Sequence, residues 1–222
     1  MLHQEKKYIE STADRMGIYL SASQINQLTT YLHELWEWNK KINLTGLSSR
    51  KQIITELLLD SLICAQYIPD GGRLLDIGSG AGFPAIPLKI KRHDLEVLLI
   101  EPKQKRVSFL RHIIRVLRLD NIQVIRGRIE HAPRGLNRNG YQTVTARAVA
   151  PLSTVLDWAS PWITEDGSII NFQGADFKDT LERSSNVLKR HGLCLARCMP
   201  YILPHTSAVR HILIFRRKRE MS

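Results

Sequence analysis

Hydrophobic residues recur with two different periods along the chain, and the change between them divides it at about residue 68. Before that point the apolar positions follow helical spacing, and Ser21 with Gln24 three residues later forms a capping-box pattern at the start of one predicted helix. The apolar stripe of this helix is Ile25, Leu28, Leu32 and Leu35. A second helix is predicted over residues 51–65. Residues 1–68 are therefore predicted to form a small helical N-terminal region.

From residue 69 onward, short apolar runs alternate with helical segments, and the turn Pro69-Asp70-Gly71-Gly72 marks the boundary. The candidate strands are residues 74–78, 95–101, 122–126, 142–147, 167–172, 193–199 and 209–215. We expect a helix after each of the first five strands and none between the last two, which then pair as an antiparallel hairpin at the sheet edge. The expected helices include residues 83–90, 103–119 and 177–189, and one that carries Pro151 in its first turn. The pattern predicts an α/β domain of seven strands over residues 69–222.

The first strand of this domain runs into a glycine-rich loop. Asp76 lies near the end of the strand, and Gly78, Gly80 and Gly82 follow at alternate positions. Such a loop lets the backbone approach a nucleotide-like ligand beside a helix N-terminus, and a packing role for the glycines is the alternative. The dinucleotide fingerprint is G-x-G-x-x-G, whereas this loop is one residue shorter. The spacing and the final hairpin resemble the Rossmann-like, class I S-adenosylmethionine-dependent methyltransferases.

Further residues are candidates for binding S-adenosylmethionine. The loop residues predicted to hold its methionine part are Asp76, Gly78, Ser79, Gly80 and Gly82, with Phe83 packing at the loop exit. Glu101 ends the second strand, where a carboxylate can accept hydrogen bonds from both ribose hydroxyls. Ile129 and Glu130, after the third strand, are placed to contact adenine, and the alternative for Glu130 is a plain helix N-terminal acid. Arg147, after the fourth strand, is a candidate to hold the cofactor carboxylate or a substrate phosphate, or simply to cap the strand.

The net positive charge of the chain indicates an anionic partner. The chain has 32 Lys and Arg against 21 Asp and Glu, a net charge of +11, which favours nucleic acid or an anionic membrane surface. Arg111, Arg115 and Arg118 are spaced to line one face of a predicted helix and contact phosphate, and a solvated face is the alternative. Arg216-Arg217-Lys218-Arg219 forms a second basic cluster, which could equally be a frayed end. Asn39 and Asn43 are four residues apart and offer hydrogen bonds to RNA or to a neighbouring loop.

Other classes of protein are disfavoured. No apolar run approaches the length of a membrane span, and the first ten residues are too polar for a secretion signal. Cys64, Cys194 and Cys198 are too few and too scattered for a disulfide framework. Cys194 and Cys198 are candidate metal ligands, but no histidine-cysteine cluster accompanies them, so buried thiols are favoured. We therefore expect a cytoplasmic protein, monomeric, with no metal and no membrane partner.

Four segments together resemble the 16S rRNA guanine-N7 methyltransferase family, also called glucose-inhibited division protein B. They are residues 38–45, 76–84, 105–110 and 146–148, and the resemblance covers residues 28–174. It implies a helical N-terminal region on a methyltransferase fold, S-adenosylmethionine as cofactor, and methylation of one guanine near the decoding site of the small ribosomal subunit. Two residues depart from the family pattern: Ala85 replaces a usual Gly, and Gln173 replaces a common Lys, which removes a charge.

The chemistry implied by the resemblance needs no general base, because guanine N7 carries a lone pair and no proton. The fourth strand ends in Thr145-Ala146-Arg147-Ala148, without the Pro-Pro-aromatic signature of amino-group methyltransferases and without a cysteine for attack on pyrimidine C5. Positioning of the two reactants can supply roughly 7–11 kcal/mol. No catalytic base is therefore predicted. The residues predicted to contact RNA near the pocket mouth are Lys40, Lys41, Lys103, Arg106 and Arg111.

Three other functions fit the sequence less well than an rRNA methyltransferase does. An NAD-dependent oxidoreductase is disfavoured by the glycine spacing and the final hairpin. A methyltransferase for another RNA or a small molecule shares the cofactor site, but a small-molecule substrate leaves the net charge of +11 unexplained. An RNA-binding protein with an inactive pocket would require loss of Asp76 or the glycines, and all are present.

Overall fold

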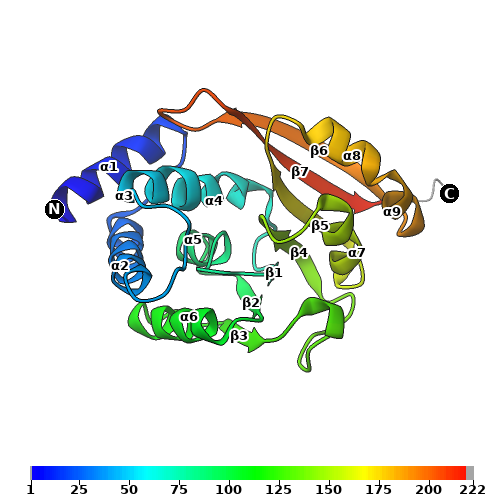
Figure 1. Cartoon of the computed structure of the whole chain (residues 1–222), viewed down its shortest axis with the longest axis horizontal. Coiled ribbons are helices and arrows are strands. Elements are labelled where there is room, and N and C mark those ends of the chain that lie inside the picture. The colour runs from blue at the N-terminus through cyan, green and yellow to red at the C-terminus, as the bar shows by residue number, and fades with distance from the viewer. Residues whose placement is uncertain (1, 219–222) are drawn as a thin grey trace.

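A seven-stranded sheet forms the centre of the protein. The computed structural model describes residues 2–218. The strands are β1 (Arg73–Ile77), β2 (Glu96–Glu101), β3 (Ile122–Arg126), β4 (Tyr141–Ala146), β5 (Ile163–Gln173), β6 (Leu193–Ile202) and β7 (Val209–Arg217). Their order is β3-β2-β1-β4-β5-β7-β6, with the first five parallel and β7 antiparallel to both neighbours (Figure 1). The predicted strands and the final hairpin are confirmed.

Helices cover both faces of this sheet. One face carries α2 (Ala22–Asn39), α5 (Ala85–Lys91) and α6 (Gln104–Val116), and the other carries α7 (Leu152–Ala159), α8 (Phe177–Arg183) and α9 (Ser185–Arg190). Pro151 is the N-cap of α7 and so lies one position before the predicted first turn. The predicted helix over residues 177–189 is wrong in one respect, because it divides at Ser184, whose hydroxyl donates to the Thr180 carbonyl at 2.8 Å. None of the described helices is long and apolar enough to cross a membrane.

The N-terminal region packs on the sheet as part of one hydrophobic core. It begins with α1 (Leu2–Arg15), and α2 follows with the predicted capping box between Ser21 and Gln24. The predicted apolar stripe of α2 is buried in the same core as Ile86 of α5 and Ile113 of α6. The sequence-predicted amphipathic helix is therefore the contact between this region and the sheet.

The second predicted helix, over residues 51–65, is helical but irregular. It consists of α3 (Arg50–Gln52), a π-helical segment η1 (Ile53–Leu59), α4 (Asp60–Leu62) and a 3-10 segment η2 (Ile63–Tyr67). The Arg147 guanidinium donates to the carbonyls of Glu56 and Leu57 in the π-helical segment. The π-helical segment thus offers two backbone carbonyls as acceptors to Arg147. The helical pattern of the sequence does not predict this contact.

A buried carboxylate, Asp60, connects this helix to the rest of the fold. The Tyr201 hydroxyl donates to Asp60 Oδ1 at 2.6 Å, and guanidinium nitrogens of Arg147 and Arg210 lie 2.8 Å and 3.5 Å from Asp60 Oδ2. Burial raises the pKa of Asp60 from its ordinary value, and Arg147 and the Tyr201 hydrogen bond partly oppose that shift. The three partners come from the end of β4 and from both strands of the hairpin.

Removing one partner should destabilise the fold, because a buried carboxylate then loses a hydrogen bond. For Tyr201→Phe we expect the free energy of unfolding to fall by about 1–3 kcal/mol in urea titrations. Tyr19→Phe is the matched control, since Tyr19 is 76% exposed and its hydroxyl makes no hydrogen bond among the described residues. Equal stability of the two variants would show that the Tyr201 hydroxyl does not support Asp60.

Candidate active site

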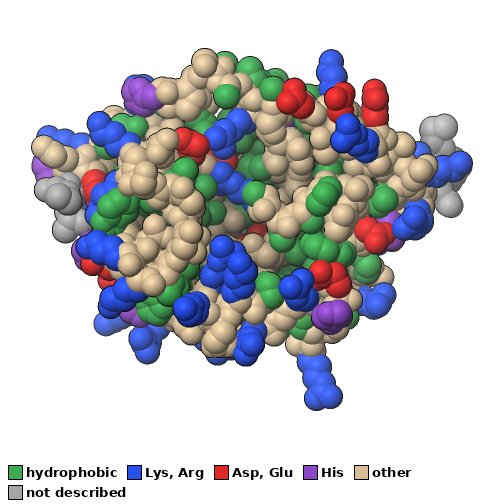
Figure 2. All heavy atoms as spheres, in the orientation of Figure 1, with side chains coloured by type: hydrophobic (Ala, Val, Ile, Leu, Met, Phe, Trp, Pro, Cys, Tyr) green, Lys and Arg blue, Asp and Glu red, His purple; other side chains and the backbone are tan. Residues whose placement is uncertain are grey.

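A cavity of about 260 Å³ opens at the carboxyl ends of β1 and β2, where ligands bind in open α/β sheets. The sequence-predicted residues that line it are Gly78, Glu101, Lys103, Arg106, Ile129 and Glu130. Val149 and Trp158 also line it and were not singled out from the sequence. Figure 2 shows that Lys and Arg side chains gather over α2 and α6 on this face of the molecule. These predicted cofactor and basic residues thus meet at the carboxyl ends of the strands. Other predicted cofactor residues do not line this cavity, namely Asp76, Ser79, Gly80, Gly82, Phe83 and Arg147.

The glycine loop has three residues in the left-handed region, with φ of +71° at Gly78, +60° at Gly80 and +101° at Gly82. A Cβ at Gly78 would lie 2.4 Å from Val149 Cγ2, and one at Gly82 would lie 2.6 Å from Ile86 Cγ1. A Cβ at Gly80 would make only ordinary contacts, 3.8 Å from the Gly78 carbonyl oxygen and 3.9 Å from Arg106 Nη1, so only its conformation requires glycine. Packing therefore requires glycine at positions 78 and 82, and the approach of a ligand to this loop stays a prediction.

Glu101 is fixed by the backbone around it. Its side chain is buried, Oε2 accepts a hydrogen bond from the Gly80 amide at 2.8 Å, and Oε1 accepts one from the Lys103 amide at 2.8 Å. Each carboxylate oxygen can accept a second hydrogen bond. The arrangement therefore suits the two hydroxyls of a ribose and costs no rearrangement of the side chain.

Asp76 has one oxygen without a partner. Thr145 Oγ1 donates to Asp76 Oδ1 at 2.7 Å, whereas Oδ2 is buried and has no hydrogen-bond partner among the described residues. Burial raises the pKa of Asp76 to about 7, although the hydrogen bond from Thr145 partly opposes the shift. An unpartnered buried carboxylate oxygen fits an ammonium group, which is what the methionine part of S-adenosylmethionine presents. Thr145 was missed from the sequence, because only the pairing of β1 with β4 places it opposite Asp76.

The remaining cofactor candidates differ in their surroundings. Ile129 and Glu130 belong to η3 (Ile129–His131) and line the cavity, and Glu130 has Arg128 3.8 Å away. Phe83 packs on Tyr31 with ring centroids 5.3 Å apart, which agrees with its predicted packing role at the loop exit. Ser79 is buried, and its hydroxyl donates to the Asp76 carbonyl at 3.1 Å.

Arg147 has partners that the sequence did not suggest. Its guanidinium pairs with Asp60 and donates to the Leu57 carbonyl at 3.2 Å. The side chain is largely buried and lies over the Phe172 ring, 5.4 Å from its centroid. These contacts assign Arg147 a role in joining the N-terminal region to β4, and a contact with cofactor or phosphate stays a prediction.

A second cavity of about 360 Å³ adjoins the cofactor cavity, since Lys103 and Arg106 line both. Lys41 and Asn43 form its other wall, together with Ile42. Three of the five predicted RNA-contacting residues therefore surround one hollow. The ammonium of Lys40 instead pairs with Glu37 at 2.7 Å, and Arg111 is exposed farther along α6.

The structure corrects one expectation about polar residues and decides between two roles for another. The predicted stripe of Arg111, Arg115 and Arg118 is wrong at its last member, because α6 ends at Val116 and Arg118 has a left-handed φ of +51°. Asn39 Oδ1 accepts hydrogen bonds from the amides of Leu44 and Thr45, at 2.8 and 3.0 Å. Of the two roles considered for Asn39, the structure therefore shows the one in a neighbouring loop.

Gln173, which departs from the family pattern, lies at the end of β5, where its amide donates to Asn171 Oδ1 at 2.6 Å. Asn171 in turn donates to the Ala146 carbonyl at 2.8 Å, next to Arg147. Within residues 2–218, no group of His, Cys, Asp and Glu side chains is arranged to hold a metal ion, and the three cysteines are free thiols.

Comparison with known structures concerns the fold. An S-adenosylmethionine-bound TYW2 from M. jannaschii is 18% identical, with a TM-score of 0.56 over 72% of this chain and 75% of that one. A SAM-dependent methyltransferase from Aquifex aeolicus is 14% identical, with a TM-score of 0.57 over 82% of this chain and 97% of that one. The fold is that of the class I S-adenosylmethionine-dependent methyltransferases.

Similarity to a protein family extends over most of the chain. A family model described as rRNA small subunit methyltransferase G matches residues 24–199. The protein called ribosomal RNA small subunit methyltransferase G in Geotalea uraniireducens is 34% identical, over 94% of this chain and 95% of its own length. The protein of the same name in Chloroflexus aggregans is 40% identical, over 90% of this chain and 84% of its own. Since these matches run through both the N-terminal region and the sheet, this chain belongs to the rRNA small subunit methyltransferase G family.

Proposed function

We propose that this protein transfers a methyl group from S-adenosylmethionine to N7 of one guanine in the 16S rRNA of the small ribosomal subunit. The observation that carries the proposal is the meeting of two cavities, one lined by the Glu101 carboxylate and the other by cationic side chains. The unpartnered carboxylate oxygen of Asp76 is buried near the end of β1, beside the glycine loop. Family membership supplies the class of substrate. An RNA target explains the cationic cavity, whereas a small-molecule methyltransferase would have no use for it.

The cofactor supplies an electrophilic methyl group on a sulfonium. Asp76 would bind the ammonium of its methionine part, within the loop of Gly78, Ser79, Gly80 and Gly82. Glu101 would accept the ribose hydroxyls, and the segment of Ile129 and Glu130 would contact the adenine. Because every one of these groups is held by the sheet or by the turns that follow it, the methyl group would be presented in one direction.

The substrate side of the site requires placement and no proton transfer. Lys41, Lys103 and Arg106 would bind phosphates around the target nucleotide, with Lys40 and Arg111 farther out. The N7 lone pair would then attack the methyl group in line with the departing sulfur, and the chain's role would be to hold both reactants. We propose that one chain suffices, because it contributes both cavities, and that it acts in the cytoplasm, where its rRNA substrate lies.

The function is tested by mapping N7-methylguanine in 16S rRNA after borohydride reduction and aniline cleavage, from cells with and without this gene. We expect one cleavage site to disappear when the gene is deleted. Purified protein with labelled S-adenosylmethionine should restore that site on naked 16S rRNA or on small subunits, and this comparison also identifies the substrate form. Unlabelled rRNA in every form would contradict the proposal and favour another RNA or a small molecule.

Cofactor affinity should depend on pH through Asp76. Its pKa of about 7 means that the free protein carries a proton there below pH 7, and the ammonium of the cofactor favours the ionised form. Affinity measured by calorimetry should therefore rise from pH 5.5 to 7, with release of a proton. By the same linkage, ionisation of Asp76 lowers the stability of the free protein as pH rises through 7.

Asp76→Asn should weaken S-adenosylmethionine binding about 10- to 100-fold at pH 7.5 and remove this pH dependence, because it removes a charged hydrogen-bond acceptor. Asp179→Asn is the control, since Asp179 is an exposed residue of α8 on the other face of the sheet. A flat pH profile in the unmodified protein would contradict the role of Asp76.

Two adjacent lysines give a matched test of the cationic cavity. Lys41→Gln should raise the KM for rRNA several-fold, with kcat and cofactor affinity unchanged, because Lys41 lines the second cavity and not the cofactor cavity. Lys40→Gln removes the same charge from a side chain that pairs with Glu37, so its effect should be smaller. Equal effects would show that the lysines act only through the overall charge.

A further inference from the structure

A third hollow lies on the other side of the molecule from the cofactor cavity, between the end of η2 and the β6–β7 hairpin. It has a volume of about 350 Å³. We call it the hairpin hollow and define it by Gln66, Tyr67, Ile68, Arg197, Ile214 and Arg216. Ile68 and Ile214 are buried and form its floor, whereas both arginines and Gln66 are exposed. The hollow is therefore an apolar depression with a cationic rim.

Strand pairing places the hairpin hollow near the amino ends of the parallel strands, whereas the cofactor cavity lies at their carboxyl ends. Arg216 pairs with Ser168 of β5, Ser168 pairs with Thr143 of β4, and Thr143 pairs with Leu74 near the start of β1. The cofactor cavity begins where β1 ends. With the usual rise and strand spacing, the two sites are on the order of 20 Å apart, so the hairpin hollow is not an extension of the active site.

A β-bulge directs the second arginine into this hollow. Leu195 pairs with Phe215 and Arg197 pairs with Ile214, so Ala196 is an extra residue in β6. Side chains alternate between faces along a strand, and without the extra residue Arg197 would lie on the face of Phe215, which is buried under α7–α9. The bulge therefore brings Arg197 onto the same face as Arg216, as bulges do where a side chain must be redirected.

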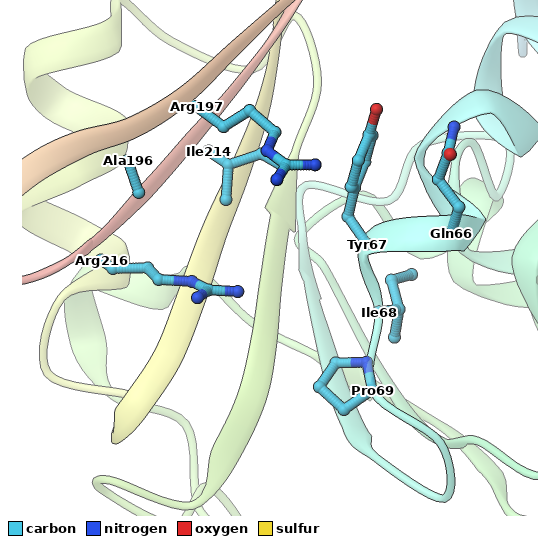
Figure 3. A pocket seen from close by; sticks show the side chains of 8 residues that line it. All are labelled: Gln66, Tyr67, Ile68, Pro69, Ala196, Arg197, Ile214 and Arg216. Atoms are coloured by element: carbon cyan, nitrogen blue, oxygen red, sulfur yellow. The ribbon is translucent and has the colours of Figure 1, made fainter.

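Among the residues that the structure describes, the two guanidinium groups have no acidic partner. Figure 3 shows both side chains extending from the hairpin into the hollow, toward the segment of Tyr67 and Pro69. Within residues 2–218 neither Arg197 nor Arg216 makes an ion pair, and no Asp or Glu lines the hollow. Arg197 lies over the Tyr67 ring, 5.5 Å from its centroid, which holds the guanidinium at the rim. Two cations that share a hollow without an acid attract an anion.

We propose that the hairpin hollow is a phosphate-ester site, occupied by the backbone of the RNA that the active site methylates. Planar guanidinium groups bind phosphate oxygens through paired hydrogen bonds, and the half-buried Tyr67 ring beside Arg197 offers a contact for a sugar or base. Only Gln66 offers a side-chain amide to a base, so the site recognises phosphate and not sequence. A strand that passes over an exposed rim fits this arrangement better than a free nucleotide. The source of the phosphate rests on the proposed function, and the site itself rests on the two arginines.

The test compares RNA binding by two doubly substituted proteins. Arg197→Gln with Arg216→Gln removes two charges from the hairpin hollow, and Lys178→Gln with Arg183→Gln removes two from exposed positions on α8. Binding to 16S rRNA is measured by fluorescence anisotropy between 50 and 300 mM salt. We expect the first variant to bind about tenfold more weakly at low salt, with a slope of log K against log salt reduced by about 2. The α8 variant should change neither quantity by as much.

Two further measurements separate the explanations. S-adenosylmethionine affinity should be unchanged in Arg197→Gln with Arg216→Gln, which shows that fold and cofactor site are intact. Adenosine monophosphate serves as the free-nucleotide probe. Suppose that adenosine monophosphate binds the unmodified protein but not Arg197→Gln with Arg216→Gln, and that this variant keeps its affinity for rRNA. The hairpin hollow then takes free nucleotides, and the proposal of an RNA site is wrong. Equal rRNA binding by both variants overturns it as well. If rRNA binds through these arginines but is never methylated, the proposed function fails and the RNA site stands.

Discussion

The ion-pair cluster around Asp60 holds together three parts of the protein that are far apart in the sequence. A buried carboxylate is costly unless it is paired and hydrogen-bonded, and Asp60 has two guanidinium groups and a tyrosine hydroxyl around it. Arg147 directly follows β4, Tyr201 lies in β6 and Arg210 lies in β7, so the cluster forms only when the N-terminal region, β4 and the hairpin have all docked. Through Arg147, this docking reaches the residues that directly follow β4 at the mouth of the cofactor cavity.

The cofactor cavity, in contrast, is set by short-range contacts at the ends of two neighbouring strands. The amides of Gly80 and Lys103 both donate to Glu101, which fixes the glycine loop relative to the start of α6. The same Lys103 borders the cationic cavity, so the proposed positions of the cofactor and of the RNA both depend on one carboxylate. A preformed site of this kind suits a reaction in which placement of the reactants is the main contribution of the protein.

The features that the sequence predicted well are those encoded by neighbouring residues. The strands, the capping box of α2 and the glycine loop each depend on a run of a few positions, and all are present in the structure. The features that were missed depend on which segments meet. Thr145 opposite Asp76 requires the strand order, and the contact of Arg147 with Asp60 requires the docking of an irregular helix. The end of α6 before Arg118 and the break at Ser184 depend on backbone conformations that a charge or apolar pattern does not report.

The extra residue at Ala196 has an effect beyond the hairpin hollow. Leu193 and Leu195, before it, pack toward α7–α9, whereas Met199 and Tyr201, after it, pack toward the N-terminal helices. The extra residue Ala196 therefore reverses which face of the sheet the odd-numbered side chains of β6 lie on. Side-chain identity at this position is of little importance, but the number of residues in β6 is not free to change: losing one would exchange the two faces of the strand's second half and take Tyr201 away from Asp60. The length of β6, more than the side chain at Ala196, therefore determines which residues of this strand face the N-terminal helices.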